Sequence, residues 1–124
     1  MLMKPKSYKD LVAWQKAMDL CVAIHQLARS FPKYELYGLA SQLRRAAISI
    51  PSNIAEGASR NTTGEFVQSL GYARGSLAEC ETQLLVAHRL GYLQDEKLNE
   101  MLQPVQEAGR LINGLIRSLA RASP

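Results

Sequence analysis

Apolar residues recur at steps of three and four along four segments of the chain, which is the spacing of one buried face of an α-helix. In the first segment this face is formed by Leu11, Trp14, Met18, Cys21, His25 and Ala28. Ser7 can cap the first turn, Asp10 suits the positive end of the helix dipole, and Pro32 cannot extend the hydrogen-bond ladder. The spacing therefore predicts a helix over residues 8–30.

A second helix is predicted over residues 35–58, although it contains a proline. Its buried face consists of Leu36, Leu39, Leu43, Ala47, Ile50 and Ile54. Pro51 lies inside this pattern, where it removes one backbone donor and clashes with the preceding turn at a cost of roughly 3 kcal/mol. We expect Pro51 to bend the helix. Gly57 and residues 59–64 are expected to supply the turn that follows.

The third helical segment is the most regular of the four. Its apolar face comprises Phe66, Leu70, Ala73, Leu77, Cys80, Leu84 and Ala87. Thr62 and Glu65 have the spacing of a capping box at the start of the segment, and Gly91 suits a left-handed cap at its end. These signals predict a helix over residues 63–90.

A fourth helix is predicted over residues 95–121, with a kink at Pro104. Its apolar face comprises Leu98, Met101, Val105, Ala108, Ile112, Leu115 and Leu119. Helices joined by short loops pack as antiparallel neighbours. The sequence thus predicts an all-α, antiparallel up-down-up-down four-helix bundle, in a single domain over residues 1–124 with 1–6 as a loose basic tail.

Polar residues form a second stripe on the two middle helices. We call these residues the polar seam, and we expect them to fix the register of the helices or the assembly of subunits. The members of the polar seam are Gln42, Arg45, Ser49, Asn53, Glu56, Ser76 and Glu79. If the helices are antiparallel about a turn near residue 60, Arg45 lies level with Ser76, Gln42 with Glu79, and Asn53 with Ser69. Either the stripes are solvated faces, or they meet in a half-buried seam in which Arg45 reaches Glu79 or a neighbouring subunit.

Two glycines on the third helix invite a further interpretation. Gly71 and Gly75 lie four residues apart, on one side of the predicted helix. Their spacing allows another backbone to approach closely, either as plain packing within the chain or as a subunit contact.

Charge enters next, because the chain is mildly basic. Its 124 residues carry 15 Lys and Arg against 11 Asp and Glu, a formal net charge of +4 with a pI near 9.3. The excess lies in residues 1–33 and is either a solvated surface or a polyanion-binding one. The candidate phosphate-binding cations are Lys4, Lys6, Lys9, Lys16, Arg44, Arg110, Arg117 and Arg121.

Catalytic and metal motifs are missing from the sequence. There is no Glu-x-x-His pair, phosphate-binding loop or nucleophile elbow, and His25 and His88 have no acidic partner three or four residues further on. Cys21 and Cys80 fall on apolar faces and are interpreted as buried free thiols. We therefore predict no enzymatic activity, no cofactor and no metal site.

The N-terminal residues lack a signal-peptide run, and no segment has the apolar length of a membrane span. We expect a cytoplasmic protein with no membrane partner.

Three runs carry a resemblance to a known family. They are LVAWQKAMDL, FPKYELYGLASQLRRAAISIPSNIAEGASR and EFVQSLGYARGSLAECETQLLVAHRLGYL. Over residues 10–93 the chain resembles the four-helix bundle proteins encoded in intervening sequences of bacterial large-subunit ribosomal RNA genes, and the last helix matches only in pattern. That family looks related to the accessory variability proteins of diversity-generating retroelements, basic pentameric bundles that bind nucleic acid together with a reverse transcriptase.

The resemblance implies a homopentamer, and five copies would raise the net charge of +4 to about +20. Three functions remain open. The first is a non-enzymatic, oligomeric module that binds nucleic acid, chiefly structured RNA, through phosphate contacts. The second is a structural ring that docks a protein such as a reverse transcriptase without touching nucleic acid. The third is an enzyme with an improvised site. Tyr8, Tyr34 and Tyr37 are the only candidate exposed stacking groups, so sequence-specific readout of single strands is not expected.

Overall fold

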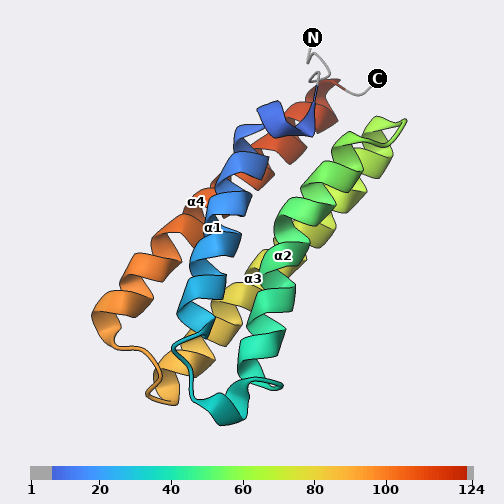
Figure 1. Cartoon of the computed structure of the whole chain (residues 1–124). Coiled ribbons are helices and arrows are strands. Elements are labelled where there is room, and N and C mark those ends of the chain that lie inside the picture. Colours follow the sequence, from blue (N-terminus) through green and yellow to red (C-terminus); the bar gives the residue numbers. More distant parts are fainter. Residues whose placement is uncertain (1–6, 123–124) are drawn as a thin grey trace.

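Four long α-helices form where the apolar spacing predicts them, and short turns join them (Figure 1). The computed structural model describes residues 7–122; the predicted tail 1–6, with Lys4 and Lys6, lies outside this range. The elements are η1 (Tyr8–Asp10), α1 (Val12–Ala28), η2 (Lys33–Glu35), α2 (Leu39–Ala58), α3 (Thr63–Arg89) and α4 (Asp95–Ala122), where η denotes a short 3-10 turn. The described residues contain no strand, so the all-α bundle is confirmed.

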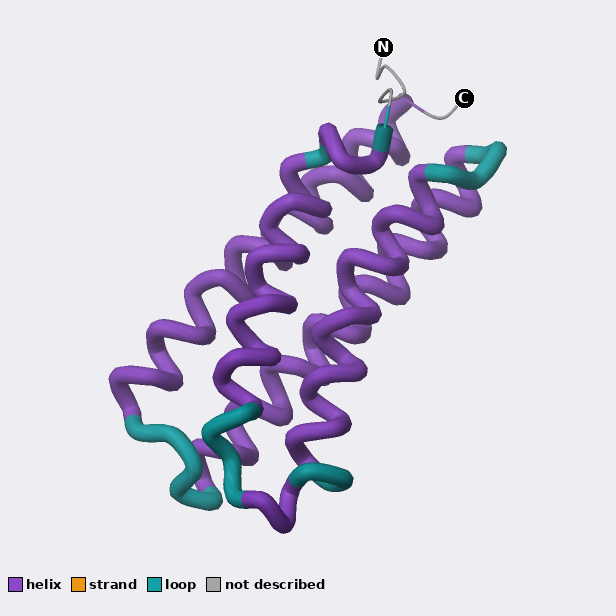
Figure 2. Tube along the Cα trace, in the orientation of Figure 1, coloured by secondary structure: helices purple, strands orange, loops and turns teal. Residues whose placement is uncertain are grey.

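Each helix packs against two neighbours. α2 lies between α1 and α3, and α4 also contacts α1 and α3, whereas no Cα atom of α1 lies within 8 Å of one in α3. Consecutive helices run in opposite directions, as the tube in Figure 2 shows. Among residues 7–122 no helix is long and apolar enough to cross a membrane.

The first helix begins later than predicted. The Ser7 hydroxyl does cap a turn, accepting from the Lys9 backbone N–H at 3.1 Å, but the turn is η1 rather than α1. The Tyr8 ring packs edge-on against Trp14 with the ring centroids 5.4 Å apart, so η1 folds back onto the helix that follows. Leu11 is extended between the two elements, and α1 starts at Val12.

The second helix also begins later, at Leu39 rather than residue 35. Gly38 has φ −110° and ψ −117°, outside the helical region, and the Glu35 carboxylate accepts from the Leu39 backbone N–H at 3.0 Å. Glu35 therefore caps α2 from outside it. Leu36, predicted on the buried face, is 48% exposed as a result.

Pro51 does not interrupt α2, which is helical on both sides of it. The proline removes the donor that Ala47 C=O would otherwise accept, at a cost of roughly 3 kcal/mol. Its ring is buried, and its neighbours Ile50 and Ile54 are 0% exposed. Burying each such side chain contributes about 1.5–3 kcal/mol, which is enough to offset the lost bond.

The core is the line along which the four apolar stripes meet. Its fully buried large side chains are Leu20, Ile24, Leu43, Ile50, Ile54, Leu70, Leu84, Ile112 and Cys80. Met18, predicted on this face, is 39% exposed, because the inward side of α1 is centred on Ala17, Leu20 and Ile24, which were predicted to widen the same stripe.

The two cysteines are buried free thiols, as predicted. Burial raises the pKa of both, that of Cys80 to about 12, so the unreactive thiol form dominates at neutral pH. They lie on α1 and α3, whose Cα atoms are nowhere within 8 Å of each other, whereas a disulfide needs a Cα separation below about 6.8 Å. A bond between them would require the backbone to move.

Candidate functional site

The contact between α2 and α3 positions the predicted polar seam, and it depends on one glycine. A Cβ atom added to Gly57 would lie 2.6 Å from the Ser69 Cβ and 3.0 Å from the Phe66 ring. Gly57 is therefore part of the last turn of α2, where it admits α3, rather than part of the loop that was predicted. Gly71 and Gly75 behave in the opposite way, since nothing within the described chain lies within 4 Å of a Cβ at either position. The interpretation of these two as packing glycines within the chain is wrong.

Ser49 and Ser76 join the two helices at the centre of the seam. Their hydroxyl oxygens lie 2.7 Å apart, and the Asn53 amide donates to the Ser49 hydroxyl at 2.9 Å and to its carbonyl at 2.8 Å. Ser76 is buried and Ser49 half-buried. At these three residues the stripes thus do meet in a half-buried seam whose polar groups satisfy one another, whereas Gln42, Arg45 and Glu79 are exposed, as on a solvated face.

The register of the seam differs from the prediction by about one helical turn. Ser76 faces Ser49 rather than Arg45, and Ser69 faces Gly57 rather than Asn53. Every Cα–Cβ bond tilts toward the N-terminus of its own helix, so side chains of α2 lean away from the connecting turn and those of α3 lean toward it. The prediction paired residues that lie at equal sequence distances from the turn. Because of the tilt, the residue on α3 that faces a given residue of α2 lies further along the chain than that rule suggests.

A shallow groove of about 330 Å³ lies above this contact, and it gathers most of the predicted seam. Its lining is Gln42, Arg45, Ala46, Ser49, Ser76, Glu79 and Gln83. Arg45 and Glu79 are both exposed and form no ion pair with each other within residues 7–122, so the Arg45–Glu79 bridge within one chain is wrong. The Gln83 side-chain oxygen is buried without a hydrogen-bond partner among the described residues.

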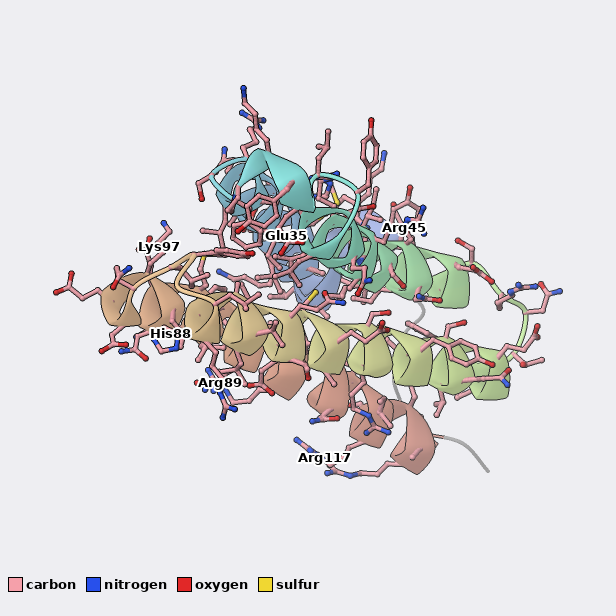
Figure 3. The ribbon with its side chains drawn as sticks, turned by 90° about the horizontal axis from the view of Figure 1, so that it is seen from below. Glu35, Arg45, His88, Arg89, Lys97 and Arg117 are labelled. Carbon is pink, nitrogen blue, oxygen red and sulfur yellow. The ribbon has the colours of Figure 1, made fainter. Side chains whose placement is uncertain are left out.

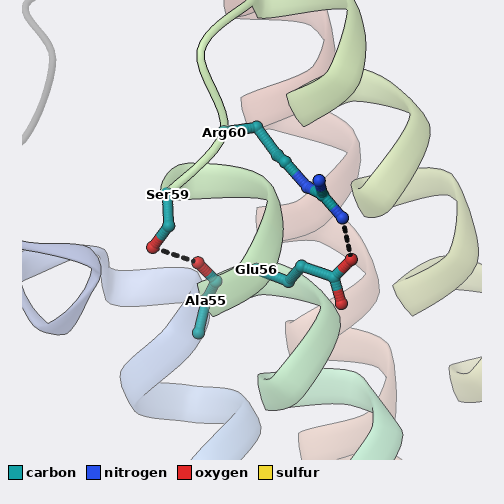
Figure 4. A network of polar contacts seen from close by, with 4 residues as sticks. All are labelled: Ala55, Glu56, Ser59 and Arg60. Carbon is teal, nitrogen blue, oxygen red and sulfur yellow. Dashed lines mark hydrogen bonds and ion pairs between the residues drawn. The ribbon is translucent and has the colours of Figure 1, made fainter.

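Glu56 does not join the groove. Its carboxylate lies 2.7 Å from the Arg60 guanidinium across the end of α2, and the Ser59 hydroxyl donates to Ala55 C=O at 2.9 Å beside it (Figure 4). Glu56 therefore closes the α2–α3 turn, and its assignment to the seam is wrong. On the far side of that turn Thr62 and Glu65 form the predicted capping box of α3, with the Glu65 N–H donating to the Thr62 hydroxyl at 3.1 Å.

The serine hydroxyls of the groove are engaged in hydrogen bonds. Its serines are bonded to each other and to Asn53, and no imidazole lines it to act as a base for either hydroxyl. His88 instead contacts Asp95 at 2.6 Å near the α3–α4 connection, and His25 bonds to Cys21 C=O at 2.9 Å. In the part of the chain that the structure describes, no three His, Cys, Asp or Glu residues are placed to hold a metal ion.

The predicted cations divide between the two ends of the bundle. Lys9, Arg110, Arg117 and Arg121 are exposed at the end where α1 begins and α4 finishes, and Arg117 extends away from the ribbon in Figure 3. Arg110 lines a groove with Leu11 and Val12, which places it beside the start of α1. None of the four forms an ion pair with another described residue.

We call Lys9, Arg110, Arg117 and Arg121 the basic end. Two other predicted cations lie outside it. Lys16 lies 3.6 Å from the Glu107 carboxylate, so part of its charge is neutralised. Arg44 lies at the opposite end of the bundle, where it donates to Leu36 C=O at 3.3 Å. Of the candidate stacking groups, Tyr34 and Tyr37 are 77% and 92% exposed, but Tyr8 is half-buried against Trp14.

Comparison with known proteins adds a family to this geometry. The family model described as 23S rRNA-intervening sequence protein matches residues 9–114, which extends the resemblance well into α4. Among solved structures, a protein of unknown function from the S23 ribosomal protein family of Bacteroides thetaiotaomicron is similar at 24% identity and a TM-score of 0.81. The alignment covers 88% of this chain and 98% of that one, and at this identity it shows the fold alone. No curated protein matches the chain.

Proposed function

The chain belongs to the 23S rRNA-intervening sequence protein family, and on that premise we propose that it is a non-enzymatic, oligomeric module that binds structured RNA through phosphate contacts. The family's name ties its members to a ribosomal RNA gene, which supports a cytoplasmic protein that works near RNA. The net charge of +4 is too small to demand a polyanion, so the proposal depends on where the charges lie.

The observation that carries the proposal is the basic end. Lys9, Arg110, Arg117 and Arg121 expose four cations, and no described carboxylate pairs with any of them. Arginine side chains present several donors in a planar fork that suits phosphate oxygens. The dipole of α4 favours cations at its C-terminus and could account for the arginines on that helix. It does not account for Lys9, which lies on η1 at the same end of the bundle.

The test is binding of an RNA hairpin, measured by fluorescence anisotropy in about 50 mM salt. We expect Arg117→Gln/Arg121→Gln to weaken binding by at least tenfold, since each lost charge-assisted contact contributes about 1.5–3 kcal/mol at best. Arg89→Gln/Lys97→Gln removes the same charge from exposed positions at the other end and should bind like the wild type. Wild-type protein that does not bind the hairpin, or equal loss in the two variants, would contradict the proposal.

A second candidate function has its own support on α3. Gly71 and Gly75 leave open space on this helix, and Tyr72, Leu85 and Val86 are 58%, 43% and 41% exposed. An open glycine pair with an exposed tyrosine next to it and exposed apolar side chains further along the same helix suits a helix from another subunit. It supports the adaptor alternative, in which subunits assemble into a ring that docks a protein such as a reverse transcriptase without contacting nucleic acid. That the ring is a homopentamer related to the retroelement accessory proteins is proposed from the family resemblance alone.

The mass in solution tests the assembly that both candidates share. We expect an oligomer at micromolar concentration that Gly71→Gln/Gly75→Gln reduces to a monomer, because the added side chains fill the open space. Gly64→Gln, at an open position in the first turn of the same helix, serves as the control and should leave the mass unchanged. A monomeric wild type would exclude the ring. Capture of a protein partner that survives nuclease treatment would favour the adaptor over the RNA-binding module.

A further inference from the structure

The corner between α1 and α2 holds a second cluster of cations, distant from the basic end. Arg29, Lys33 and Arg44 surround a pocket of about 400 Å³ whose floor is apolar and includes Phe31, Leu36 and Ala40. This volume falls within the range of roughly 300–1,000 Å³ that is typical of small-ligand sites. Three positive charges around an apolar floor suit a ligand with an anionic group and a flat apolar part.

The one carboxylate in this stretch is turned away from the pocket. Between residues 29 and 44 the sequence has three cations and a single acid, Glu35. The two Glu35 oxygens accept from the Leu39 N–H at 3.0 Å and from the Tyr92 hydroxyl at 2.7 Å, and Glu35 does not line the pocket. Figure 3, which views the molecule from below, labels Glu35 near the start of α2. None of the three cations forms an ion pair with another residue in the range 7–122.

The corner is held in place before any ligand arrives. The η2 turn is closed by backbone bonds from Glu35 N–H to Pro32 C=O at 2.9 Å and from Leu36 N–H to Lys33 C=O at 3.1 Å. Arg44 is fastened over it by its 3.3 Å bond to Leu36 C=O. A preformed site loses less conformational entropy when it binds a ligand.

Two exposed tyrosines are neighbours in sequence of residues that line the pocket, and the ring of one of them, Tyr34, lies against Tyr92. Tyr34 and Tyr37 follow Lys33 and Leu36 in the chain and are 77% and 92% exposed, and Tyr37 makes no aromatic contact within residues 7–122. A positive groove with exposed rings is the arrangement by which proteins hold unpaired nucleotides, with the backbone on the cations and the bases on the rings.

We propose that the α1–α2 corner binds a single-stranded RNA segment without sequence preference, its phosphates on Arg29, Lys33 and Arg44 and its bases over Leu36 and Tyr37. The inference builds on the proposed RNA-binding function and adds a second site of different chemistry. The basic end would hold paired RNA by phosphate alone, whereas the corner would hold an unpaired stretch next to it.

The test uses fluorescein-labelled oligouridine of about ten nucleotides, within the roughly 4–16 nucleotides that such sites cover. We expect Arg29→Gln/Lys33→Gln to weaken its binding about tenfold and to reduce the salt slope by about 1.4, at about 0.7 per phosphate on a single strand. Leu36→Gln/Tyr37→Ser should weaken it about fivefold with the slope unchanged, because it removes apolar contact and no charge. All four side chains are exposed, so thermal melting should show that both variants fold.

Arg89→Gln/Lys97→Gln is the matched control, since it removes two exposed cations from the same end of the bundle and should bind oligouridine like the wild type. The inference would be overturned if the wild type does not bind oligouridine or if either corner variant binds it with wild-type affinity. It would also be overturned if the control variant loses as much affinity as the corner variants. An RNA hairpin is measured in parallel. Loss of hairpin binding in Arg117→Gln/Arg121→Gln, with oligouridine binding unchanged, separates the two sites, and a hairpin that never binds refutes the proposed function alone.

Discussion

At the scale of single residues, the packing of α2 on α3 depends on the missing side chain of Gly57. We expect Gly57→Ala to destabilise the fold by about 1–3 kcal/mol, because its Cβ would lie 2.6 Å from that of Ser69 and overpack the contact. Helix propensity alone predicts the opposite sign, a gain of about 1 kcal/mol. Urea denaturation distinguishes the two.

Gly64→Ala is the control for this substitution, because nothing lies within 4 Å of a Cβ at that position. Its free energy of unfolding should equal that of the wild type or exceed it by up to about 1 kcal/mol, the gain that helix propensity predicts. A Gly57→Ala protein at least as stable as Gly64→Ala would show that α3 does not approach α2 as closely as described.

The Ser49–Ser76 hydrogen bond gives a second residue-scale prediction. Ser76→Ala should cost about 1 kcal/mol of stability, and a double-mutant cycle with Ser49→Ala should show a coupling of about 0.5–1.5 kcal/mol. The sequence-based register placed Arg45 level with Ser76. In a cycle of Arg45→Ala with Ser76→Ala, the changes in the free energy of unfolding should be additive. Coupling in the Arg45 pair and none in the Ser49 pair would restore the register that the sequence predicted.

At the scale of elements, the Glu35–Tyr92 bond connects the α1–α2 connection to the segment between α3 and α4. Hydrogen bonds, first from the Tyr92 hydroxyl and then from the Leu39 N–H, hold the pKa of Glu35 below its ordinary value. The stability gained from a lowered carboxyl pKa is complete above the unfolded pKa and is lost as the pH falls through the folded one. The pKa of Tyr92 is raised, chiefly by its bond to Tyr34, so its own contribution persists up to its ordinary value near 10.

Tyr92→Phe should therefore melt several degrees below the wild type at neutral pH, with a gap that shrinks as the pH falls below the ordinary carboxyl pKa and through the lowered pKa of Glu35. Thermal scans by circular dichroism from pH 3 to 8 provide the measurement. Tyr37→Phe, at a ring that is 92% exposed, should follow the wild type throughout. A Tyr92→Phe gap that is the same at every pH would show that the hydroxyl does not act through the carboxylate.

The elements themselves were largely predictable, because apolar spacing, the Thr62–Glu65 capping box and Gly91 are local signals. Gly91 has φ +83°, the left-handed cap that its position indicated. The late start of α2 was not predictable, since the Glu35 side chain that caps it is itself held by Tyr92, a residue distant in sequence.

The candidate site was predictable in most of its members, Glu56 excepted, but not in its pairing. Ser49, Ser76, Gln42, Arg45 and Glu79 do line one groove, as their shared stripe indicated. Their register depends on the tilt of side chains in two facing helices, and the glycine that matters depends on which face each helix turns inward. Neither property can be predicted from the residue spacing of a single helix. Close packing was therefore predicted at Gly71 and Gly75, whereas it occurs at Gly57.

At the scale of the whole molecule, cations gather in two separate clusters although the net charge of the chain is small. The basic end and the α1–α2 corner lie at opposite ends of the bundle (Figure 1). In an oligomer, copies of each cluster would add together, so a formal charge of +4 per chain is compatible with strong RNA binding. The position of the charges therefore matters more than their sum.

The most direct test of RNA binding by the basic end is the salt dependence of the affinity for an RNA hairpin. With Lys9, Arg110, Arg117 and Arg121 on phosphates, log K should fall against log salt with a slope of about −3 to −4 per chain, at about −0.9 per contact. Arg117→Gln/Arg121→Gln should lower that slope by about 2, whereas Arg89→Gln/Lys97→Gln should leave it unchanged. A flat salt dependence, or a slope that both variants change equally, would contradict phosphate binding by the basic end.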